Sequence, residues 1–462
     1  MDVRHRLALM ALMAFLLIVP VTAWAHVSEG ALVLLMPTGF YTAAGVSAVL
    51  MSVVVAAFLT PTGAARLFAS RKIYLPRIGG LQFILPAAGL MVFIAAFVAG
   101  ILGEQHPLEN LMPLYLWTLL WLILPAVQVI FGDVWSRMNP WAFVALFLKG
   151  STEQTGKTCW FALVFFLVIY LFAMVDVAPD APARLAVFSG LYWLFHLGMM
   201  LWKGPGWLAR GEGFTVLFAL LARLSPMAGG RIGLPGHKLH QDLHPRGQCG
   251  NNPMPSVAFF AIAMLAAGSY DGINETFWWL SQIGVNPLAF PGRSQVVAPM
   301  LMGFIMAQLT LLLGFSAICF LGWCLAARPG RFQDFFTVMA LALLPIAAGY
   351  HVAHYLTAFL VNGQYLKIAV TEMFHFSHAA DHAEVYITTG FFNRPSYVRD
   401  IYIVQSCAIV SGHILAILLS HSFALGITNN RITALKSQAP LIVFMIAYTF
   451  LGLWLLASPR GV

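Results

Sequence analysis

The chain has 462 residues, of which 60% are hydrophobic and only 9% are charged. So few charged side chains cannot cover the surface of a soluble protein of this size, and the mean hydropathy of +0.83 agrees. The net charge of +8 does not indicate a nucleic-acid partner, because most Lys and Arg residues fall in short segments between apolar runs, where they set membrane orientation. Composition therefore predicts an integral membrane protein with the lipid bilayer as its surroundings.

Several apolar runs approach the twenty or so residues that a helix needs to cross a bilayer, and they do not alternate as barrel strands would. The predicted fold class is all-α, a polytopic transmembrane helical bundle with about nine spans after an N-terminal signal sequence. Residues 26–462 form a single membrane domain in this interpretation. The five cysteines are scattered without a Cys-x-x-Cys pair, so neither a disulfide framework nor a thiolate metal site is expected.

The first 25 residues have the pattern of a cleavable secretory signal. A basic start precedes an apolar run at residues 7–21, and the small residues Ala23 and Ala25 follow. Cleavage after Ala25 would make His26 the mature N-terminus, whose amine and imidazole together can chelate an ion such as Cu(II). An uncleaved anchor, or a cleaved end that binds nothing, is the alternative.

The remaining apolar segments run from residues 31–59 to residues 441–456, and the Lys and Arg content of their connections alternates. Residues 66–77 and 431–436 are predicted to be cytoplasmic, and the mature N-terminus and residues 362–400 periplasmic, in a bacterial inner membrane. The apolar run at residues 214–224 is too short to cross, so we interpret it as interfacial or re-entrant. Residues 225–255 form the one long polar stretch, predicted to be a loop.

Half of the fourteen histidines lie between residues 350 and 421. His351 and His354, at i and i+3, share one helix face. His375, His378 and His382 fall within about 60° of arc if residues 367–389 are helical. A predicted loop of about a dozen residues joins the two groups, so they can meet at the periplasmic face.

Nitrogen ligands without a thiolate suit copper or zinc, and His26 is expected on the same side of the membrane. Glu372 and Asp381 lie near the second group, where a carboxylate can orient an imidazole. The alternative is a set of interfacial histidines with ordinary hydrogen bonds. The predicted metal ligands are His26, His351, His354, His375, His378 and His382.

Other polar residues within or beside the spans are weaker candidates. For His413 and His421 three interpretations are open: they continue an ion path, they are ligands of a haem, or they only pack against neighbouring helices. His196 is interpreted as a structural residue. His237, His240 and His244 repeat the spacing of the 375–382 group, which favours movement of an ion if the repeat is functional. Asp271 and Glu275 lie at the predicted outer boundary of the membrane. They are interpreted as metal ligands, as bases, or only as the polar end of a helix.

Several short motifs resemble a known family. They are Trp135-Ser-Arg-Met-Asn-Pro-Trp141, Gly213-Phe-Thr-Val with Leu221-Ala-Arg-Leu-Ser-Pro226, Tyr270-Asp-Gly272 and Tyr350-His-Val-Ala-His-Tyr355. Together they are similar to polytopic bacterial membrane proteins labelled after a membrane subunit of fenitrothion hydrolase, over residues 135–360. The resemblance implies organophosphate ester hydrolysis but assigns no catalytic residues, and the 375–382 histidines are not part of the pattern.

Three functions remain open from the sequence. The first is metal handling or transport, of copper in particular, with a periplasmic metal-carrier protein as the implied partner. The second is a membrane metalloenzyme, either a hydrolase or an oxygenase acting on an apolar substrate, in which Glu372, Asp381 or Glu275 acts as base. The third is a haem-binding membrane protein, which requires histidine pairs on facing helices.

Overall fold

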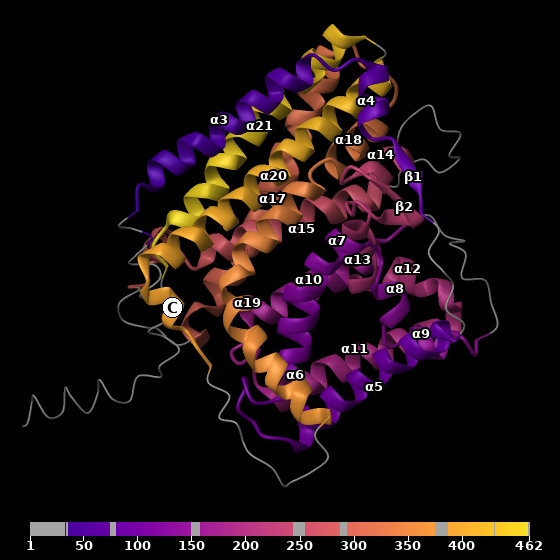
Figure 1. The fold of residues 1–462 in the computed structure, drawn as a ribbon, viewed down its shortest axis with the longest axis vertical. Coiled ribbons are helices and arrows are strands. Elements are labelled where there is room, and N and C mark those ends of the chain that lie inside the picture. Colours follow the sequence, from indigo (N-terminus) through magenta and orange to yellow (C-terminus); the bar gives the residue numbers. More distant parts are fainter. Residues whose placement is uncertain are drawn as a thin grey trace, which may run out of the picture.

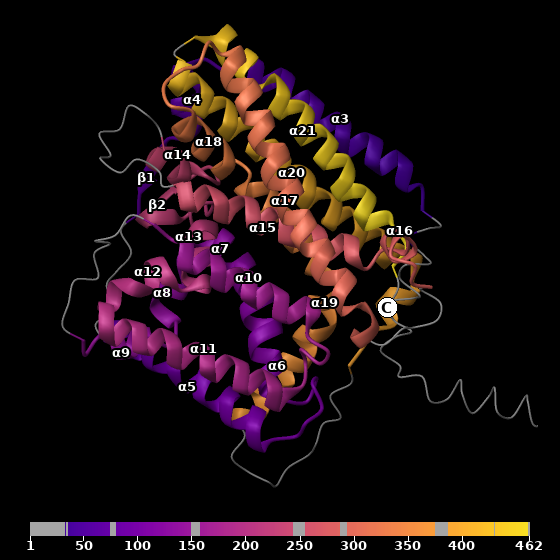
Figure 2. The same ribbon diagram turned by 180° about the vertical axis from the view of Figure 1, so that it is seen from behind.

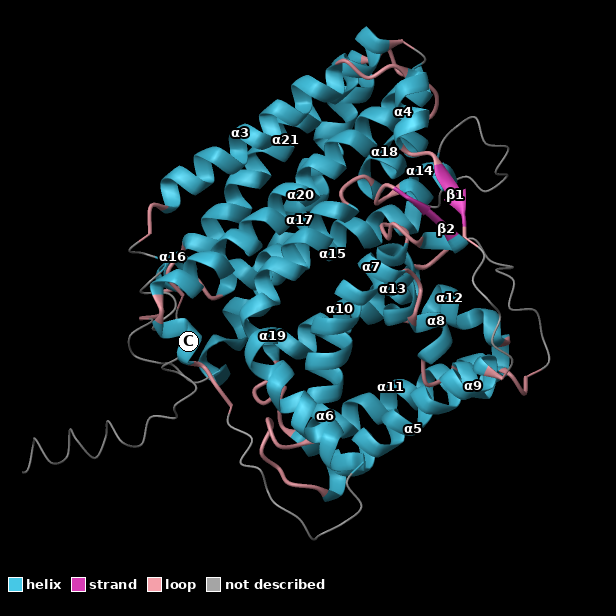
Figure 3. Cartoon of the chain, viewed as in Figure 1, coloured by secondary structure: helices cyan, strands magenta, loops and turns pink. Residues whose placement is uncertain are grey.

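The computed structural model describes residues 33, 36–73, 80–148, 158–243, 255–286, 293–374, 387–428 and 430–460, with the backbone alone at 372–374. Nine helices in these ranges are long and apolar enough to cross a membrane. Figure 3 shows a bundle of helices in which a two-stranded sheet is the one strand structure drawn. The predicted all-α polytopic bundle is confirmed.

One group of helices comes from the first half of the chain and occupies the lower right of Figure 1. Its long members, α5 and α11, pack against each other. A shorter helix, α10, packs against α13, a ten-residue helix that is almost wholly buried. The helices of this group are α5 (Leu81–Leu102), α6 (Leu111–Pro113), η1 (Leu114–Ile123), α7 (Leu124–Phe131), α8 (Trp135–Met138), α9 (Ala142–Ala145), α10 (Trp160–Val175), α11 (Pro182–Lys203), η2 (Pro205–Trp207), α12 (Leu208–Gly211) and α13 (Gly213–Ala222).

The second group contains the N-terminal helix and the second half of the chain. Figures 1 and 2 agree that α3 lies outermost, beside α21, with α20, α17 and α15 further in. α20 packs against α19, α21 and α3, which ties the group together. The helices are α3 (Thr38–Ala57), α15 (Pro255–Asn274), α16 (Phe277–Gln282), α17 (Arg293–Leu325), α18 (Phe332–Leu341), α19 (Leu344–Phe374), η5 (Gly390–Asn393), α20 (Pro395–Thr428) and α21 (Arg431–Ala457).

The two groups meet where η1, α7, α10 and α13 face α15 and α19. η1 has π-helical winding, an irregularity that is frequent at functional sites. It runs into Pro125, which has no backbone N–H and cannot donate the α-helical bond to the carbonyl of Trp121. That carbonyl therefore needs another donor, and its donor comes from the second group.

The predicted loop between His354 and His375 is wrong. α19 is a continuous helix from Leu344 to Phe374. At 1.5 Å per residue, about 30 Å of helix therefore separates His354 from position 374. Hydropathy ended the predicted span near residue 361 because the apolar run ends there, whereas the helix itself continues. Residues 375–386, which contain the second histidine group, lie outside the described residues.

Several short segments that carry basic residues follow one side of the bundle. α4 (Pro61–Leu67), α14 (His237–Leu243), β1 (Ser70–Lys72) and β2 (Arg231–Gly233) lie along the right of Figure 1, above α12 and α8. β1 and β2 pair antiparallel, with Arg71 opposite Ile232. The polar stretch predicted as a loop thus contributes a strand and a short helix, and its residues 244–254 lie outside the described residues.

The arrangement predicts which ends of α5 face each compartment. Arg71 precedes α5, Glu104 follows it, and both are exposed. Both variants are made in a background with the exposed Cys407 replaced by Ser. A membrane-impermeant maleimide added outside intact cells should label Glu104→Cys. It should label Arg71→Cys only after permeabilisation, because basic segments stay in the cytoplasm. Labelling of Arg71→Cys in intact cells would reverse the orientation.

Candidate functional site

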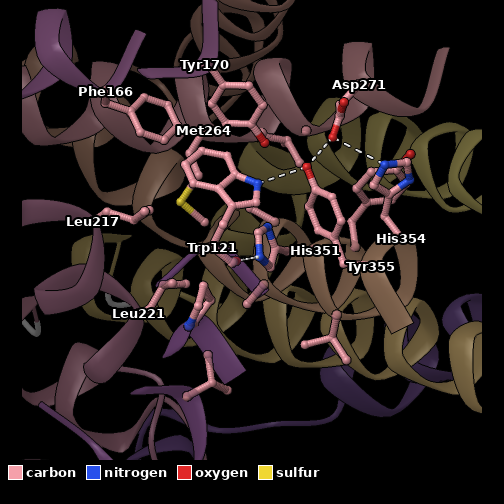
Figure 4. Close-up of a pocket in the computed structure, with 18 residues that line it drawn as sticks. Trp121, Phe166, Tyr170, Leu217, Leu221, Met264, Asp271, His351, His354 and Tyr355 are labelled. Carbon is pink, nitrogen blue, oxygen red and sulfur yellow. Dashed lines mark hydrogen bonds and ion pairs between the residues drawn. The ribbon is translucent and has the colours of Figure 1, made fainter. Parts of the chain in front are cut away.

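A cavity of about 30 Å³ lies at the junction of the two helix groups. A single buried water needs about 10–15 Å³ on this scale, so the cavity has room for one or two molecules of that size. Its wall is mostly apolar, but α15 and α19 place a few polar groups together on one side of it. Figure 4 shows that Asp271, His351, His354 and Tyr355 are these polar groups, with Trp121 beside Tyr355 and His351.

Asp271, on α15, is the acidic group of the site. Its Oδ2 atom accepts a hydrogen bond from the Tyr355 hydroxyl and lies 3.2 Å from His354 Nε2. The side chains of Asp271 and His354 are only 15% and 6% exposed. Within the described ranges no lysine or arginine comes within ion-pairing distance of this carboxylate. Among the described residues, the Tyr355 hydroxyl and the His354 imidazole are the polar groups that contact the Asp271 carboxylate.

Trp121, on η1, connects the two helix groups through two hydrogen bonds. Its indole N–H donates to the Tyr355 hydroxyl at 2.9 Å. Its carbonyl cannot receive an α-helical hydrogen bond from Pro125, which has no N–H, and instead accepts a hydrogen bond from His351 Nε2 at 2.7 Å. The Tyr170 ring meets the indole edge to face, with 4.7 Å between the ring centroids. The indole is thus held in one orientation between α10 and α19.

His351 and His354 share a helix face as predicted, but each bonds to a different partner. Figure 4 shows the Tyr355 ring between the two imidazoles, and its centroid lies 4.8 Å from that of His351 and 4.7 Å from that of His354. His354 Nδ1 is buried and has no hydrogen-bond partner among the described residues. In the described part of the chain, no group of three or more His, Cys, Asp or Glu side chains is placed to hold a metal ion.

The other predicted metal ligands lie in segments that the structure does not describe. His26, His375, His378 and His382 lie outside the described residues, as does Asp381, and only the backbone of Glu372 is described. The metal-site prediction is therefore untested at these positions. What the described residues show is that His351 and His354 alone, on either side of Tyr355, do not form a complete metal site.

Two of the motifs behind the family resemblance meet at this cavity. Tyr270-Asp-Gly272 supplies Asp271, and Tyr350-His-Val-Ala-His-Tyr355 supplies its partners. Gly272 permits a close approach, because a Cβ atom there would lie 1.8 Å from the hydroxyl of the buried Tyr350. The sequence identified Asp271 as a candidate beside the histidines, but Tyr355 and Trp121 carried no signal that marked them as its partners.

A second buried carboxylate was not identified from the sequence. Glu212 is 0% exposed and caps α13, accepting from the backbone N–H groups of Phe214 and Thr215 at 2.9 and 2.6 Å. The hydroxyls of Thr215 and Tyr192 also donate to it. Tyr192 lies in the middle of α11, so Glu212 is deep in the bundle. The sequence signal available was an acidic residue just before an apolar helix.

The remaining membrane histidines have contacts that packing explains. The Trp207 indole donates to His196 Nδ1 at 3.1 Å, in agreement with the structural interpretation. His413 and His421 lie on one helix, α20, where their Nδ1 atoms bond to the Ile409 carbonyl and to Gln438. The facing histidine pair that a haem requires is therefore not formed by these two residues.

The polar-stretch histidines join α14 to the bundle. His240 Nε2 lies 2.7 Å from the Ser422 hydroxyl, and its ring stacks on Phe68 and Phe423. Burial lowers the pKa of His237 below its usual value. His244 lies outside the described residues, and the two described histidines act as packing residues in these contacts.

Comparison with known proteins gives no neighbour for this arrangement: no family model, no curated protein and no solved structure matches the chain. The fold and the site nevertheless define a class, which is a polytopic helical membrane protein with a buried carboxylate–imidazole pair between two helix groups.

The close fit of Gly272 against Tyr350 can be tested by substitution. Gly272→Ala should lower the apparent melting temperature and cost about 1–3 kcal/mol, because the added Cβ forces the buried Tyr350 ring to shift. Gly268→Ala, one turn earlier on α15, is the matched control, since a Cβ there meets Tyr350 only at 3.7 Å. Equal melting temperatures for the two variants in detergent would show that the approach is loose.

Proposed function

We propose that this protein is a membrane transporter for a small cation, and that Asp271 with His354 forms its exchange site for the cation and a proton. The observation that carries the proposal is the buried carboxylate itself, which lies 3.2 Å from an imidazole and beyond the reach of lysine or arginine in the described ranges. Ionisable groups inside a membrane bundle are costly and characteristically mark ion pathways and proton relays.

The charge of the pair explains how exchange would work. With His354 neutral, Asp271 leaves one uncompensated negative charge in the bundle. A proton on His354 or a small cation in the cavity each cancels that charge, so the two compete for the same place. The cavity of about 30 Å³ limits the cation to the size of one or two waters.

The position of the pair between two helix groups also favours transport. Asp271 and His354 belong to one group, whereas Trp121 and Tyr170 belong to the other. Substrate and ion sites of many secondary transporters lie where two helical units meet, beside irregular helix segments. Here η1 is π-helical, and Ala342 and Leu343 separate α18 from α19.

The transport proposal can be tested in proteoliposomes that contain a pH-sensitive dye. Under an imposed pH gradient, wild-type protein should give proton flux that depends on an added small cation. The panel tested is ammonium, potassium, sodium, Cu(II) and Zn(II). Asp271→Asn should lower this flux at least about tenfold, since it removes the charge at which proton and cation compete.

Glu275→Gln is the matched control, because Glu275 lies one turn away on the outer surface and pairs with Arg460 at 3.5 Å. Its flux should equal that of the wild type. Flux that no cation of the panel changes, or equal flux in Asp271→Asn and wild-type protein, would contradict the proposal.

Metal handling is a second candidate function. It is favoured by the hydrogen bonds of the two imidazoles, each of which has Nε2 beside an oxygen acceptor, Asp271 for His354 and the Trp121 carbonyl for His351. Metal-bound histidines are commonly oriented in this way, with the second nitrogen left for the ion. The further ligands would have to come from His26, His375, His378 or His382.

Elemental analysis of protein purified without chelators tests this second function. Copper or zinc should be present in a fixed ratio to protein, and His354→Ala should lower it at least about tenfold, by comparison with the 10–100-fold typical of changes around metal ligands. His413→Ala, on a different helix, should retain the metal. A metal-free wild type would contradict metal handling while leaving the transport of other cations open.

A further inference from the structure

A second cavity, also about 30 Å³, lies within the first helix group. Most of its wall is made of aromatic rings from α5, η1, α8, α11 and α13 and from the residues around α9. The rings on which the argument rests are Tyr115, Trp135, Trp141, Tyr192, Trp193 and Phe214. The second cavity is distinct from the cavity beside Asp271. Trp121 lines the cavity beside Asp271, Phe214 lines the second cavity, and the centroids of these two rings are 6.3 Å apart.

Two of the tryptophan rings are held by hydrogen bonds to other parts of the first helix group. The Trp141 indole donates to the Trp193 carbonyl at 3.0 Å, and the Trp135 indole donates to the Thr215 hydroxyl at 3.3 Å. The centroids of Tyr192 and Phe214 are 6.3 Å apart, with the rings nearly perpendicular. The aromatic wall is therefore organised before anything binds.

The carboxylate of Glu212 lies directly behind this wall. Tyr192, which lines the cavity, donates its hydroxyl proton to Glu212, and Thr215 links Glu212 to Trp135. Glu212 is 0% exposed, and in the described part of the chain it has no Lys, Arg or His within ion-pairing distance. Burial raises the pKa of Glu212 above its usual value, although its hydrogen-bond donors favour the ionised form. When ionised, Glu212 places a negative potential on the cavity, which favours a cation inside it.

Two polar groups of the cavity lining have no hydrogen-bond partner among the described residues, the Ser189 hydroxyl and the Trp193 indole N–H, and of these only the hydroxyl oxygen can accept from a cation. The Ser189 hydroxyl on α11 is buried without a hydrogen bond, and Ser189 as a whole is 7% exposed. A buried hydroxyl without a partner costs free energy, so a ligand that donates a hydrogen bond to it would be stabilised. An ammonium N–H is such a donor.

We propose that this cavity binds a small ammonium cation, either ammonium itself or methylammonium. Aromatic faces attract such cations through the ring quadrupole, Glu212 supplies the opposite charge, and the Ser189 oxygen accepts an N–H bond. The volume has room for about two water-sized groups, which excludes a tetramethylammonium ion and a lipid headgroup. The site requires neither Asp271 nor His354, so it stands apart from the transport proposal.

Isothermal titration calorimetry of the full-length protein in lipid nanodiscs tests the site, with methylammonium chloride as the probe. Wild-type protein should bind methylammonium saturably, whereas potassium chloride and tetramethylammonium chloride should give no saturable heat. Ser189→Ala should weaken methylammonium binding at least about tenfold, because it removes a hydrogen bond to a charged donor. Glu212→Gln should weaken it by at least as much.

Ser316→Ala is the matched control. Ser316 lies on α17, and its hydroxyl donates to the Leu312 carbonyl at 2.6 Å within the same helix. Its affinity for methylammonium should equal that of the wild type. Absence of saturable methylammonium binding in the wild type would overturn the proposal, and so would wild-type affinity in Ser189→Ala. Ser189→Ala keeps the test decisive if Glu212→Gln fails to fold.

Discussion

The structure depends on one constraint, which is that polar groups inside an apolar bundle must find their partners within the protein. Pro125 deprives the Trp121 carbonyl of its α-helical donor, and His351 from another helix provides the replacement at 2.7 Å. The same tryptophan reaches Tyr355, which donates to Asp271. A single residue on η1 therefore joins the two helix groups and completes the carboxylate site between them.

The fold class could be predicted because crossing a bilayer requires apolar runs of about twenty residues, and hydropathy records such runs directly. Hydropathy records the apolar thickness and not the length of the helix, which is why α19 continues to Phe374 beyond its apolar part. The shared face of His351 and His354 followed from their spacing. Their partners did not, because Trp121 is 230 positions away from His351 in sequence, and no local pattern links two such distant segments.

The two buried carboxylates are held in different ways, and the difference separates their roles. Glu212 accepts from two backbone N–H groups and two hydroxyls, a set of donors that suits a fixed negative charge at the start of α13. Asp271 has one hydroxyl and one imidazole at its Oδ2 atom, and the imidazole can change its own charge. Under the two proposals, Glu212 supplies a fixed charge behind the aromatic cavity, and Asp271 exchanges the groups that balance its charge.

The bonds around Asp271 also connect its charge to the contact between helix groups. Tyr355 donates to Asp271 while it accepts from Trp121, so the three groups form one chain across the junction. In the proposed exchange, a proton on His354 or a cation in the cavity weakens the attraction of the Asp271 carboxylate for the Tyr355 hydroxyl, and the donor from Trp121 then loses a well-oriented acceptor. Under the transport proposal, neutralising Asp271 loosens this connection between the groups. A cavity that admits only one or two water-sized species needs such loosening before its contents can leave.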